Sequence, residues 1–364
     1  MPINQLHGTL QRLLLQLRPA ERVTRVRNWS RLLVGLCLSR SVHLSKIANK
    51  IPTTKATLPS ATRRLSRLLD NAAVRVRAWY EPIARSLLER AAHEGGEVRL
   101  IVDGSKVGFE HRLLMVGLAY RRRAIPVAWS WVRSEKGHSS AYKQRALLDY
   151  VRRLTPDGAW VSVVGDSEFG AVALIEQLEE WGWHYVLRQK RTHLVGGGDE
   201  WEPLGESIEG AGQTRWMENV LLSRLHAHRT NLLLHWKGGE TEPWLLATDL
   251  PAPRQALSAY RRRMWIEQMF ADFKGHGFDL ESTQLRRFGR LSRLTLAVAM
   301  LYVWLVVYGA EVVKRGQRRL VDRSDRRDHS LFRVGYNMLD RCLAQGIRPF
   351  VRLLPSSLPK LSGG

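Results

Sequence analysis

The chain has 364 residues, a length that predicts two or three folded units rather than one. Hydrophobic residues make up 44% of it, as in an ordinary globular protein with a sizeable core. Lys and Arg outnumber Asp and Glu by 57 to 34, which gives a net charge of +23. Such an excess destabilises a compact protein by self-repulsion unless a polyanion is a regular partner. The composition therefore favours nucleic-acid binding over a ribosomal-type, chaperone-like or peripheral membrane protein.

Residues 1–22 lack the unbroken apolar core of a secretory signal, so the cytoplasm is the expected location. One apolar run, Leu294–Ala310, has about 17 residues and lies at the short limit for a membrane span. A single span there would leave the other elements without a clear role. A helix buried on all sides in a large domain is therefore the favoured interpretation, and a membrane protein is the weakest alternative.

Residues 1–95 are predicted to be helical throughout, because their apolar residues recur at three-to-four spacing. Two short amphipathic segments, His43–Ile51 and Ser60–Asn71, are joined by a Pro- and Thr-rich turn. They outline a helix-turn-helix over residues 43–71 and make this a predicted DNA-binding region. A solvated basic face is the alternative for the same pattern. The basic residues placed to meet phosphates or bases are Arg63, Arg64 and Arg67.

The periodicity changes after Gly95 and Gly96, and residues 96–189 alternate between strand and helix patterns. Three strands come first, then helix, strand, helix and strand. That order predicts an α/β domain with a mixed sheet flanked by helices. The predicted strands are Val98–Val102, Leu113–Tyr120, Ala124–Val132, Trp160–Gly165 and His184–Arg188.

Residues 190–252 contain clustered glycines and alternating segments typical of antiparallel strands, which indicates a β-rich insertion. Residues 253–315 return to helix, beginning with a predicted helix from Ser258 to Phe273, and form the second part of the interrupted domain. Residues 316–364 are predicted to be a basic helical region with a polar tail.

Two aspartates follow predicted strands. Asp103 ends the strand Val98–Val102, and Asp166 ends the strand Trp160–Gly165. Carboxylates at the carboxyl ends of strands lie on the rim of a sheet, where ligands bind in such architectures. Taken singly, each is also an ordinary turn residue.

The helix that follows the insertion is more informative. Tyr260, Arg263, Glu267 and Lys274 are spaced three, four and seven residues apart. On a continuous helix Arg263 would lie roughly 40° from Glu267, and Tyr260 and Lys274 roughly 20° from it. A stripe of these four residue types is too polar for a core face. A surface salt bridge would explain the Arg and the Glu alone, whereas a carboxylate flanked by Arg, Lys and Tyr suits a metal and a phosphate.

The motif Tyr260-x2-Arg263-x3-Glu267-x6-Lys274 resembles, in residue types and spacing, the Y-(2)-R-(3)-E-(6)-K motif of bacterial insertion-sequence transposases of the DDE type. A β-rich insertion before the Glu, the stretch LLMVGLAYRRRAIPVAW and the segment KGHGFDLE are also similar to that family. The resemblance implies an RNase H-like catalytic core over residues 96–189 and 253–315. It also implies the metal-binding, catalytic triad Asp103, Asp166 and Glu267.

The chemistry implied by that resemblance is metal-dependent cleavage at transposon ends followed by strand transfer into target DNA. Three converging carboxylates can hold two divalent cations, and all-oxygen ligands suit Mg²⁺, with Mn²⁺ as a substitute. Arg263 and Lys274 would bind phosphates, and Tyr260 would hydrogen-bond one. The implied partners are double-stranded DNA, namely terminal inverted repeats and target, and a second copy of the chain in a homodimeric synaptic complex. The protein would then be associated with the bacterial nucleoid when bound to DNA.

Many members of the family pass through a hairpinned DNA end, and those stack a flipped base on a Trp of the insertion. Trp244 and Trp236 are the candidates here, although a buried structural role is the alternative for each. Two other functions remain open. The first is a catalytically silent DNA-binding protein derived from a transposase, and the second is an RNase H-like nuclease without strand transfer.

Overall fold

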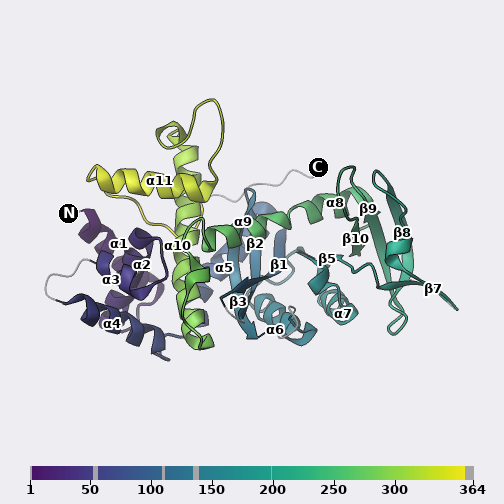
Figure 1. The fold of residues 1–364 in the computed structure, drawn as a ribbon, viewed down its shortest axis with the longest axis horizontal. Helices are drawn as coiled ribbons and strands as arrows, with labels where there is room; N and C mark the ends of the chain where they lie inside the picture. The colour runs from purple at the N-terminus through teal and green to yellow at the C-terminus, as the bar shows by residue number, and fades with distance from the viewer. Residues whose placement is uncertain (1, 52–55, 109–110, 134–138, 198, 357–364) are drawn as a thin grey trace. The chain divides into compact units, whose positions relative to one another are not determined.

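The computed structural model describes residues 2–51, 56–108, 111–133, 139–197 and 199–356. The chain divides into two compact units. Figure 1 labels the helices and strands of both. The helical unit comprises Met1–Leu87, Val107–His111 and Met269–Leu358. The sheet unit comprises Leu88–Lys106 and Arg112–Gln268.

The helical unit begins with the helices predicted from the apolar spacing, and α5 continues beyond it into residues of the sheet unit. In α1, Leu6, Leu10 and Leu14 recur every four residues and are buried, so they form the face that packs on α2. The bounds of these helices are α1 (Pro2–Leu17), α2 (Val23–Ser39), α3 (Leu44–Lys50), α4 (Leu58–Asp70) and α5 (Val76–Gly95).

Helices α3 and α4 pack together where the helix-turn-helix was predicted. Thr57 caps α4 by accepting a hydrogen bond from the Ser60 N–H. The buried face of α4 is apolar, and the guanidinium of Arg293 donates to the carbonyl of Leu69 in its last turn. Residues 52–55 of the connecting turn lie outside the described residues. The opposite face of α4 exposes Arg63, Arg64 and Arg67.

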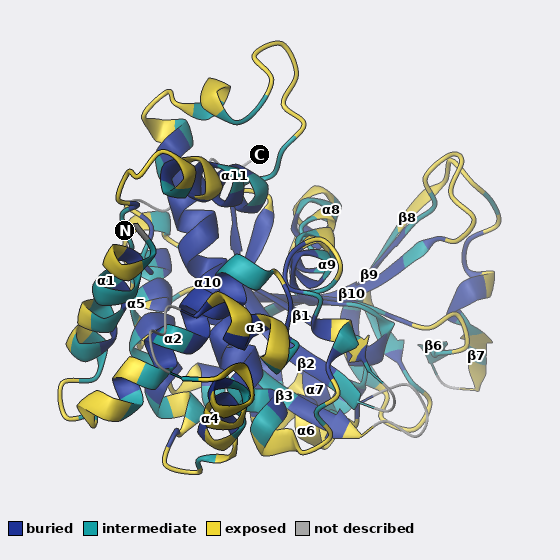
Figure 2. Cartoon of the chain, turned by 60° about the vertical axis from the view of Figure 1, so that its left-hand side comes forward, coloured by how far each residue is buried: buried dark blue, intermediate teal, exposed yellow. Residues whose placement is uncertain are grey.

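The core of the helical unit is α10 (Phe288–Lys314), which is coloured as buried over most of its length in Figure 2. It is the one helix of the described residues long and apolar enough to cross a membrane, and 89% of its apolar stretch is buried in the protein. Helix α10 crosses α11 (Leu331–Ala344) so closely that a Cβ on Gly309 would lie 1.9 Å from the carbonyl oxygen of Leu331. The two helices can approach this closely because Gly309 and Gly335 lack side chains.

The sheet unit contains one ten-stranded sheet with the order β3-β2-β1-β4-β5-β10-β9-β8-β6-β7. Strands β1, β4 and β5 are parallel, whereas β10 pairs antiparallel with β5. The mixed sheet and its helices confirm the predicted fold class. The bounds are β1 (Val98–Val107), β2 (His111–Tyr120), β3 (Arg123–Arg133), α6 (Ala141–Arg152), β4 (Val161–Gly165), α7 (Val172–Glu180) and β5 (His184–Arg188).

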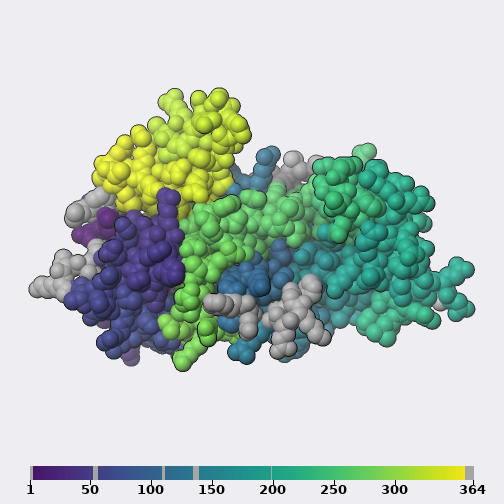
Figure 3. Space-filling view, viewed as in Figure 1, coloured from purple at the N-terminus to yellow at the C-terminus, as the bar shows by residue number. Residues whose placement is uncertain are grey.

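Residues 190–252 supply the other five strands and extend the same sheet through the β5–β10 pairing. The space-filling view shows this teal-coloured part of the chain at the molecular surface (Figure 3). The hairpin between β8 and β9 carries Leu225, which is 87% exposed. The bounds are β6 (Leu194–Gly197), β7 (Glu200–Pro203), β8 (Thr214–Leu222), β9 (His228–His235) and β10 (Trp244–Thr248).

Two local predictions were wrong. Strand β1 does not end before Asp103 but continues to Val107. Its pairing with β4 stops at Val102 and Gly165, whereas β2 remains its neighbour on the other side. Asp103 is therefore the first residue of β1 beyond the parallel pair, still at the carboxyl edge of β4.

The second correction concerns the helix predicted from Ser258 to Phe273. The structure has two helices, α8 (Pro253–Arg261) and α9 (Met264–Phe273), separated by Arg262 and Arg263. The turn tightens because the N–H of Arg263 donates to the carbonyl of Tyr260, three residues back, at 2.9 Å. The continuous four-turn face predicted for the motif is therefore broken at Arg263.

Candidate active site

The three predicted catalytic carboxylates converge on the guanidinium of Arg263. Its Nη2 lies 3.5 Å from an Oδ of Asp103 and 3.7 Å from an Oδ of Asp166. Its Nη1 donates to Glu267 at 2.5 Å. The side chains come from β1, from the end of β4 and from α9, all within the sheet unit. The structure therefore brings together residues that are far apart in the sequence.

Asp103 is the most buried member of this group, with 7% of its side chain exposed. Burial raises the pKa of Asp103 to about 7, since desolvation disfavours the carboxylate. The charge of Arg263 and the hydrogen bond from the Gly104 N–H oppose that rise, and the charges of Asp166 and Glu267 add to it. A nearby positive charge therefore stabilises the carboxylate form of Asp103, which burial and the other two acids destabilise.

Arg263 responds to the same field. Burial alone would lower its pKa, but Asp103, Tyr260, Glu267 and Asp166 raise it above the ordinary value. The guanidinium is therefore charged and serves as the counter-ion shared by the three carboxylates.

Asp166 is oriented by the backbone that follows it. Its Oδ1 accepts a hydrogen bond from the N–H of Glu168 at 3.0 Å, and this caps a single 3-10 turn, Ser167–Phe169. The other carboxylate oxygen stays available to Arg263. The segment DSEFG thus aims Asp166 because of its own local hydrogen bonds.

Glu168 supports this turn from the protein interior. Only 1% of its side chain is exposed, and it pairs with Arg112 of β2. Its second carboxylate oxygen accepts hydrogen bonds from both the N–H and the hydroxyl of Ser139, each at 2.6 Å. Arg112 lies over Gly104, where a Cβ would come within 2.4 Å of its Nε. The Glu168–Arg112 pair therefore links the backbone segments that carry Asp103 and Asp166.

Sequence reasoning did not find Arg112 or Ser139. An arginine at the start of an otherwise apolar strand, in HRLLMVGLAY, is the signal that could have indicated a buried ion pair. Ser139 carried no such signal, because its role depends on contacts with a residue 29 positions later.

Tyr260 is buried, with 3% of its surface exposed. Its predicted place on a polar face was therefore wrong. Its ring meets Trp244 edge-on at a centroid distance of 5.0 Å. Burial raises the pKa of Tyr260 to about 12. Its phenol therefore stays protonated near neutral pH, and its ring packs against Trp244.

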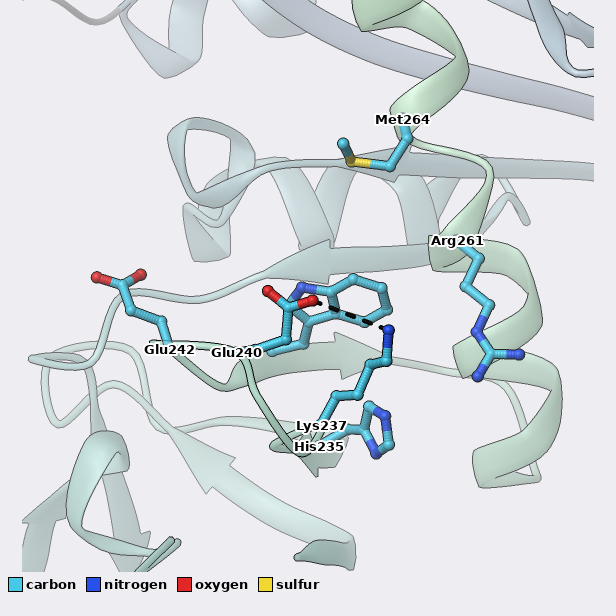
Figure 4. A pocket seen from close by; sticks show the side chains of 7 residues that line it. His235, Lys237, Glu240, Glu242, Arg261 and Met264 are labelled. Carbon is cyan, nitrogen blue, oxygen red and sulfur yellow. Dashed lines mark ion pairs between the residues drawn. The ribbon is translucent and has the colours of Figure 1, made fainter. Parts of the chain in front are cut away.

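Trp244 lines a cavity of about 290 Å³. Figure 4 shows Arg261 and Met264, from the α8–α9 turn region, above the segment that carries His235 and Lys237. Lys237 and Glu240 form an ion pair at 3.9 Å across one side. A partly exposed indole thus lies in one concave surface with the basic side chains Lys237 and Arg261 and the acidic side chains Glu240 and Glu242.

Trp236, the second tryptophan candidate, is more fully engaged. Its indole N–H donates to the carbonyl of Glu240 at 2.9 Å, and Arg191 lies over its ring. It is absent from the lining of the cavity around Trp244. Lys274, the last motif residue, belongs to the helical unit and pairs there with Glu281 at 2.7 Å.

The donor set of the triad fits a hard divalent cation, because it consists only of carboxylate oxygens. Within the described residues, no three His, Cys, Asp or Glu side chains are already grouped as ligands of a single ion. The carboxylates instead surround the guanidinium of Arg263. The fit to a metal therefore rests on donor chemistry and on the shared need for positive charge.

A family model described as "Transposase DDE domain" matches residues 116–304, just over half of the chain. Asp166, Arg263 and Glu267 lie inside the matched range, and Asp103 lies before it. A cryo-EM structure of the piggyBac transposase synaptic complex with hairpin DNA is similar at 10% identity, with a TM-score of 0.45. That alignment covers 98% of this chain and 84% of that chain. The search of curated proteins returned no match.

The chain belongs to the transposase DDE domain family. Its function is accordingly DNA transposition.

Proposed function

We propose that the protein cleaves DNA at the ends of an insertion sequence and joins those ends to target DNA, using Asp103, Asp166 and Glu267 as the metal ligands. The observation that carries this proposal is the convergence of the three carboxylates on one guanidinium. Structural ion pairs usually join one acid to one base. Three acids around one base leave a surplus of negative charge that suits a metal site.

Two Mg²⁺ ions, replaceable by Mn²⁺, would activate the attacking oxygen and stabilise the leaving oxygen. Backbone N–H groups orient two of the three carboxylates. The Gly104 N–H donates to Asp103 at 2.7 Å and orients it. Asp166 is oriented by the Glu168 N–H, and Glu267 lies in the first turn of α9. With these orientations set before the substrate arrives, little reorganisation is needed at the reaction.

Arg263 and Lys274 are proposed to bind phosphates of the DNA end. A guanidinium matches the geometry of a phosphate and can donate two parallel hydrogen bonds. The burial of Tyr260 favours a different role for this residue from direct phosphate binding. Its ring packs edge-on against Trp244, and we assign it to holding that indole in place.

The cavity at Trp244 is proposed to receive a base that is unstacked at the DNA end. An aromatic face binds any base, and nearby cations bind the attached phosphate. The partial exposure of Trp244, its edge-on contact with Tyr260 and the presence of Arg261 in the same cavity support Trp244 for this role. Trp236 is the weaker candidate, because its ring and N–H are already engaged.

Sequence-specific binding is assigned to the N-terminal region, through the exposed Arg63, Arg64 and Arg67 of α4. A homodimer that synapses two terminal inverted repeats is the proposed assembly. The bacterial cytoplasm, with the protein on the nucleoid, is the proposed location. Membership in the family favours these roles over a silent DNA-binding protein or a nuclease without strand transfer.

The test uses purified full-length protein, Mg²⁺ or Mn²⁺, and duplex DNA that carries the inverted repeats flanking the gene. Wild-type protein is expected to cleave the repeat end and to join it to a second duplex. Glu267→Gln is expected to bind the same duplex without cutting it. Cleavage that persists in Glu267→Gln contradicts the assignment of the triad, and cleavage without joining supports the nuclease instead.

A further inference from the structure

Arg263 makes contact with all three carboxylates, but only one of these contacts is tight. The hydrogen bond to Glu267 is 2.5 Å long. The contacts with Asp103 and Asp166, at 3.5 and 3.7 Å, are longer than the ~2.8 Å of a good charge-assisted hydrogen bond. The guanidinium therefore makes one strong hydrogen bond, to Glu267, and two weaker ion pairs, to Asp103 and Asp166.

A further donor of Arg263 is unsatisfied. Its Nε is buried and has no hydrogen-bond partner among the described residues. An unpaired buried donor can still donate to a further acceptor, and the Nε atoms of Arg18 and Arg31 are in the same state. The arrangement around Arg263 is thus incomplete on both sides: the acids lack full pairing, and the guanidinium lacks one acceptor.

The main chain of Arg263 is held by hydrogen bonds that do not involve its side chain. The residue lies between α8 and α9, with its N–H bonded to Tyr260 and its carbonyl bonded to the Ile266 N–H at 3.2 Å. Because these bonds involve only main-chain atoms, rotation of the long side chain leaves them intact.

We propose that Arg263 is an exchangeable counter-ion of the triad. In the DNA-free protein it neutralises the carboxylates, and when DNA binds, a phosphate draws the guanidinium away and opens the carboxylates to divalent metal. The proposal rests on the proposed function, because it assumes that the triad binds metal. A guanidinium and a metal ion compete for the same oxygens. DNA phosphate and metal therefore bind cooperatively, each raising the affinity for the other by the same factor.

The first experiment measures Mn²⁺ affinity of the DNA-free, full-length protein from the electron paramagnetic resonance signal of free Mn²⁺. Arg263→Gln is expected to bind Mn²⁺ about tenfold more tightly than wild type, within the 5- to 150-fold range of such couplings. Arg254→Gln is the matched control. It removes the same charge from an exposed position on α8, and no ion pair joins Arg254 to a carboxylate in the described part of the chain. This control is expected to bind Mn²⁺ like wild type.

The second experiment repeats the titration with a 5′-phosphorylated duplex carrying the flanking inverted repeat. Mn²⁺ bound by the DNA alone is subtracted with Asp166→Asn protein. Wild-type protein is expected to gain about tenfold in Mn²⁺ affinity when the duplex is added. Arg263→Gln is expected to gain little, because its carboxylates are already open.

Arg263→Lys preserves the charge and guards against a failure of the Gln variant to fold, which circular dichroism reports. A lysine cannot span three carboxylates, so its DNA-free Mn²⁺ affinity is expected between those of wild type and Arg263→Gln. Equal Mn²⁺ affinity in wild type and both Arg263 variants overturns the exchange while leaving the metal site intact, provided that Asp166→Asn loses binding. Mn²⁺ binding that Asp166→Asn does not reduce overturns the proposed function itself.

Discussion

The sheet unit contains two ion-pair groups, Glu168 with Arg112 and the triad with Arg263. They differ in how completely their carboxylates are paired. Glu168 is almost fully buried, and all of its oxygens have partners in Arg112 and Ser139. The triad has three acids that share one arginine, and two of its three contacts are as long as 3.5 and 3.7 Å. The fully paired carboxylate of Glu168 fixes the turn that carries Asp166. The three carboxylates that share Arg263 still have the capacity to bind a further cation.

The largest effect on stability is expected from Glu168→Gln. The substitution leaves the Arg112 guanidinium without its buried carboxylate, and breaking a buried pair in this way costs about 3 kcal/mol. Thermal or denaturant unfolding measures the loss. Asp149→Asn is the matched control, since its pair with Arg153 on α6 is exposed and contributes less than about 0.5 kcal/mol. Equal losses in the two variants would remove the distinction between a structural and an exposed pair.

A second contrast separates Trp244 from Trp236, two of the tryptophans of the insertion. Replacement of Trp244 by Ala is expected to weaken binding of a DNA end with an unpaired terminal base by about 1–3 kcal/mol, because a stacking surface is lost. Trp236→Ala is expected to have a much smaller effect on that affinity. Fluorescence anisotropy with blunt and frayed duplexes measures both. The assignment is reversed if Trp236→Ala gives the larger loss.

Ser139→Ala tests how much one hydrogen bond to Glu168 contributes to the stability of the protein. It deletes one of the two hydrogen bonds that Ser139 donates to Glu168 and keeps the other, which comes from the backbone. The expected loss in unfolding free energy is about 2 kcal/mol, typical of one hydrogen bond to a charged acceptor. A loss as large as that of Glu168→Gln would show that the segment at Ser139, and not the ion pair, holds the turn.

The smallest effect on stability is expected from Glu267→Gln. Its side chain is 40% exposed, and its single strong contact is the i,i+4 pair with Arg263. Removal of one negative charge from the cluster also relieves repulsion, so the unfolding free energy is expected to change by less than about 1 kcal/mol. Calorimetry of the metal-free protein measures the change. A loss comparable to that of Glu168→Gln would place the triad among structural charges.

The sequence predicted much of this site because the motif is local. Spacing placed Arg263 and Glu267 near each other, and strand patterns placed Asp103 and Asp166 at the same sheet edge. The break between α8 and α9 was missed, since periodicity carries no sign of the 3-10 hydrogen bond that turns the chain at Arg263. Without that break, the position of the guanidinium among all three acids was not predictable.

The remaining misses depend on long-range contacts. Tyr260 is buried because Trp244 arrives from β10, and β10 is positioned by its pairing with β5. The role of Glu168 depends on Arg112 and Ser139, which lie 56 and 29 residues away. Local propensity and hydrophobic period contain no information on such pairings, whereas they identified most of the helices and strands themselves.

The central claim is that Asp103, Asp166 and Glu267 together bind divalent metal, and Fe²⁺-directed cleavage of the polypeptide tests it most directly. Fe²⁺ substitutes for Mg²⁺ at oxygen sites and, with ascorbate and peroxide, cuts the nearby backbone. The account predicts DNA-stimulated cuts clustered near residues 103, 166 and 267, suppressed by excess Mg²⁺ and lost in Asp166→Asn. Cuts elsewhere, or cuts near these residues that Asp166→Asn retains, would contradict it.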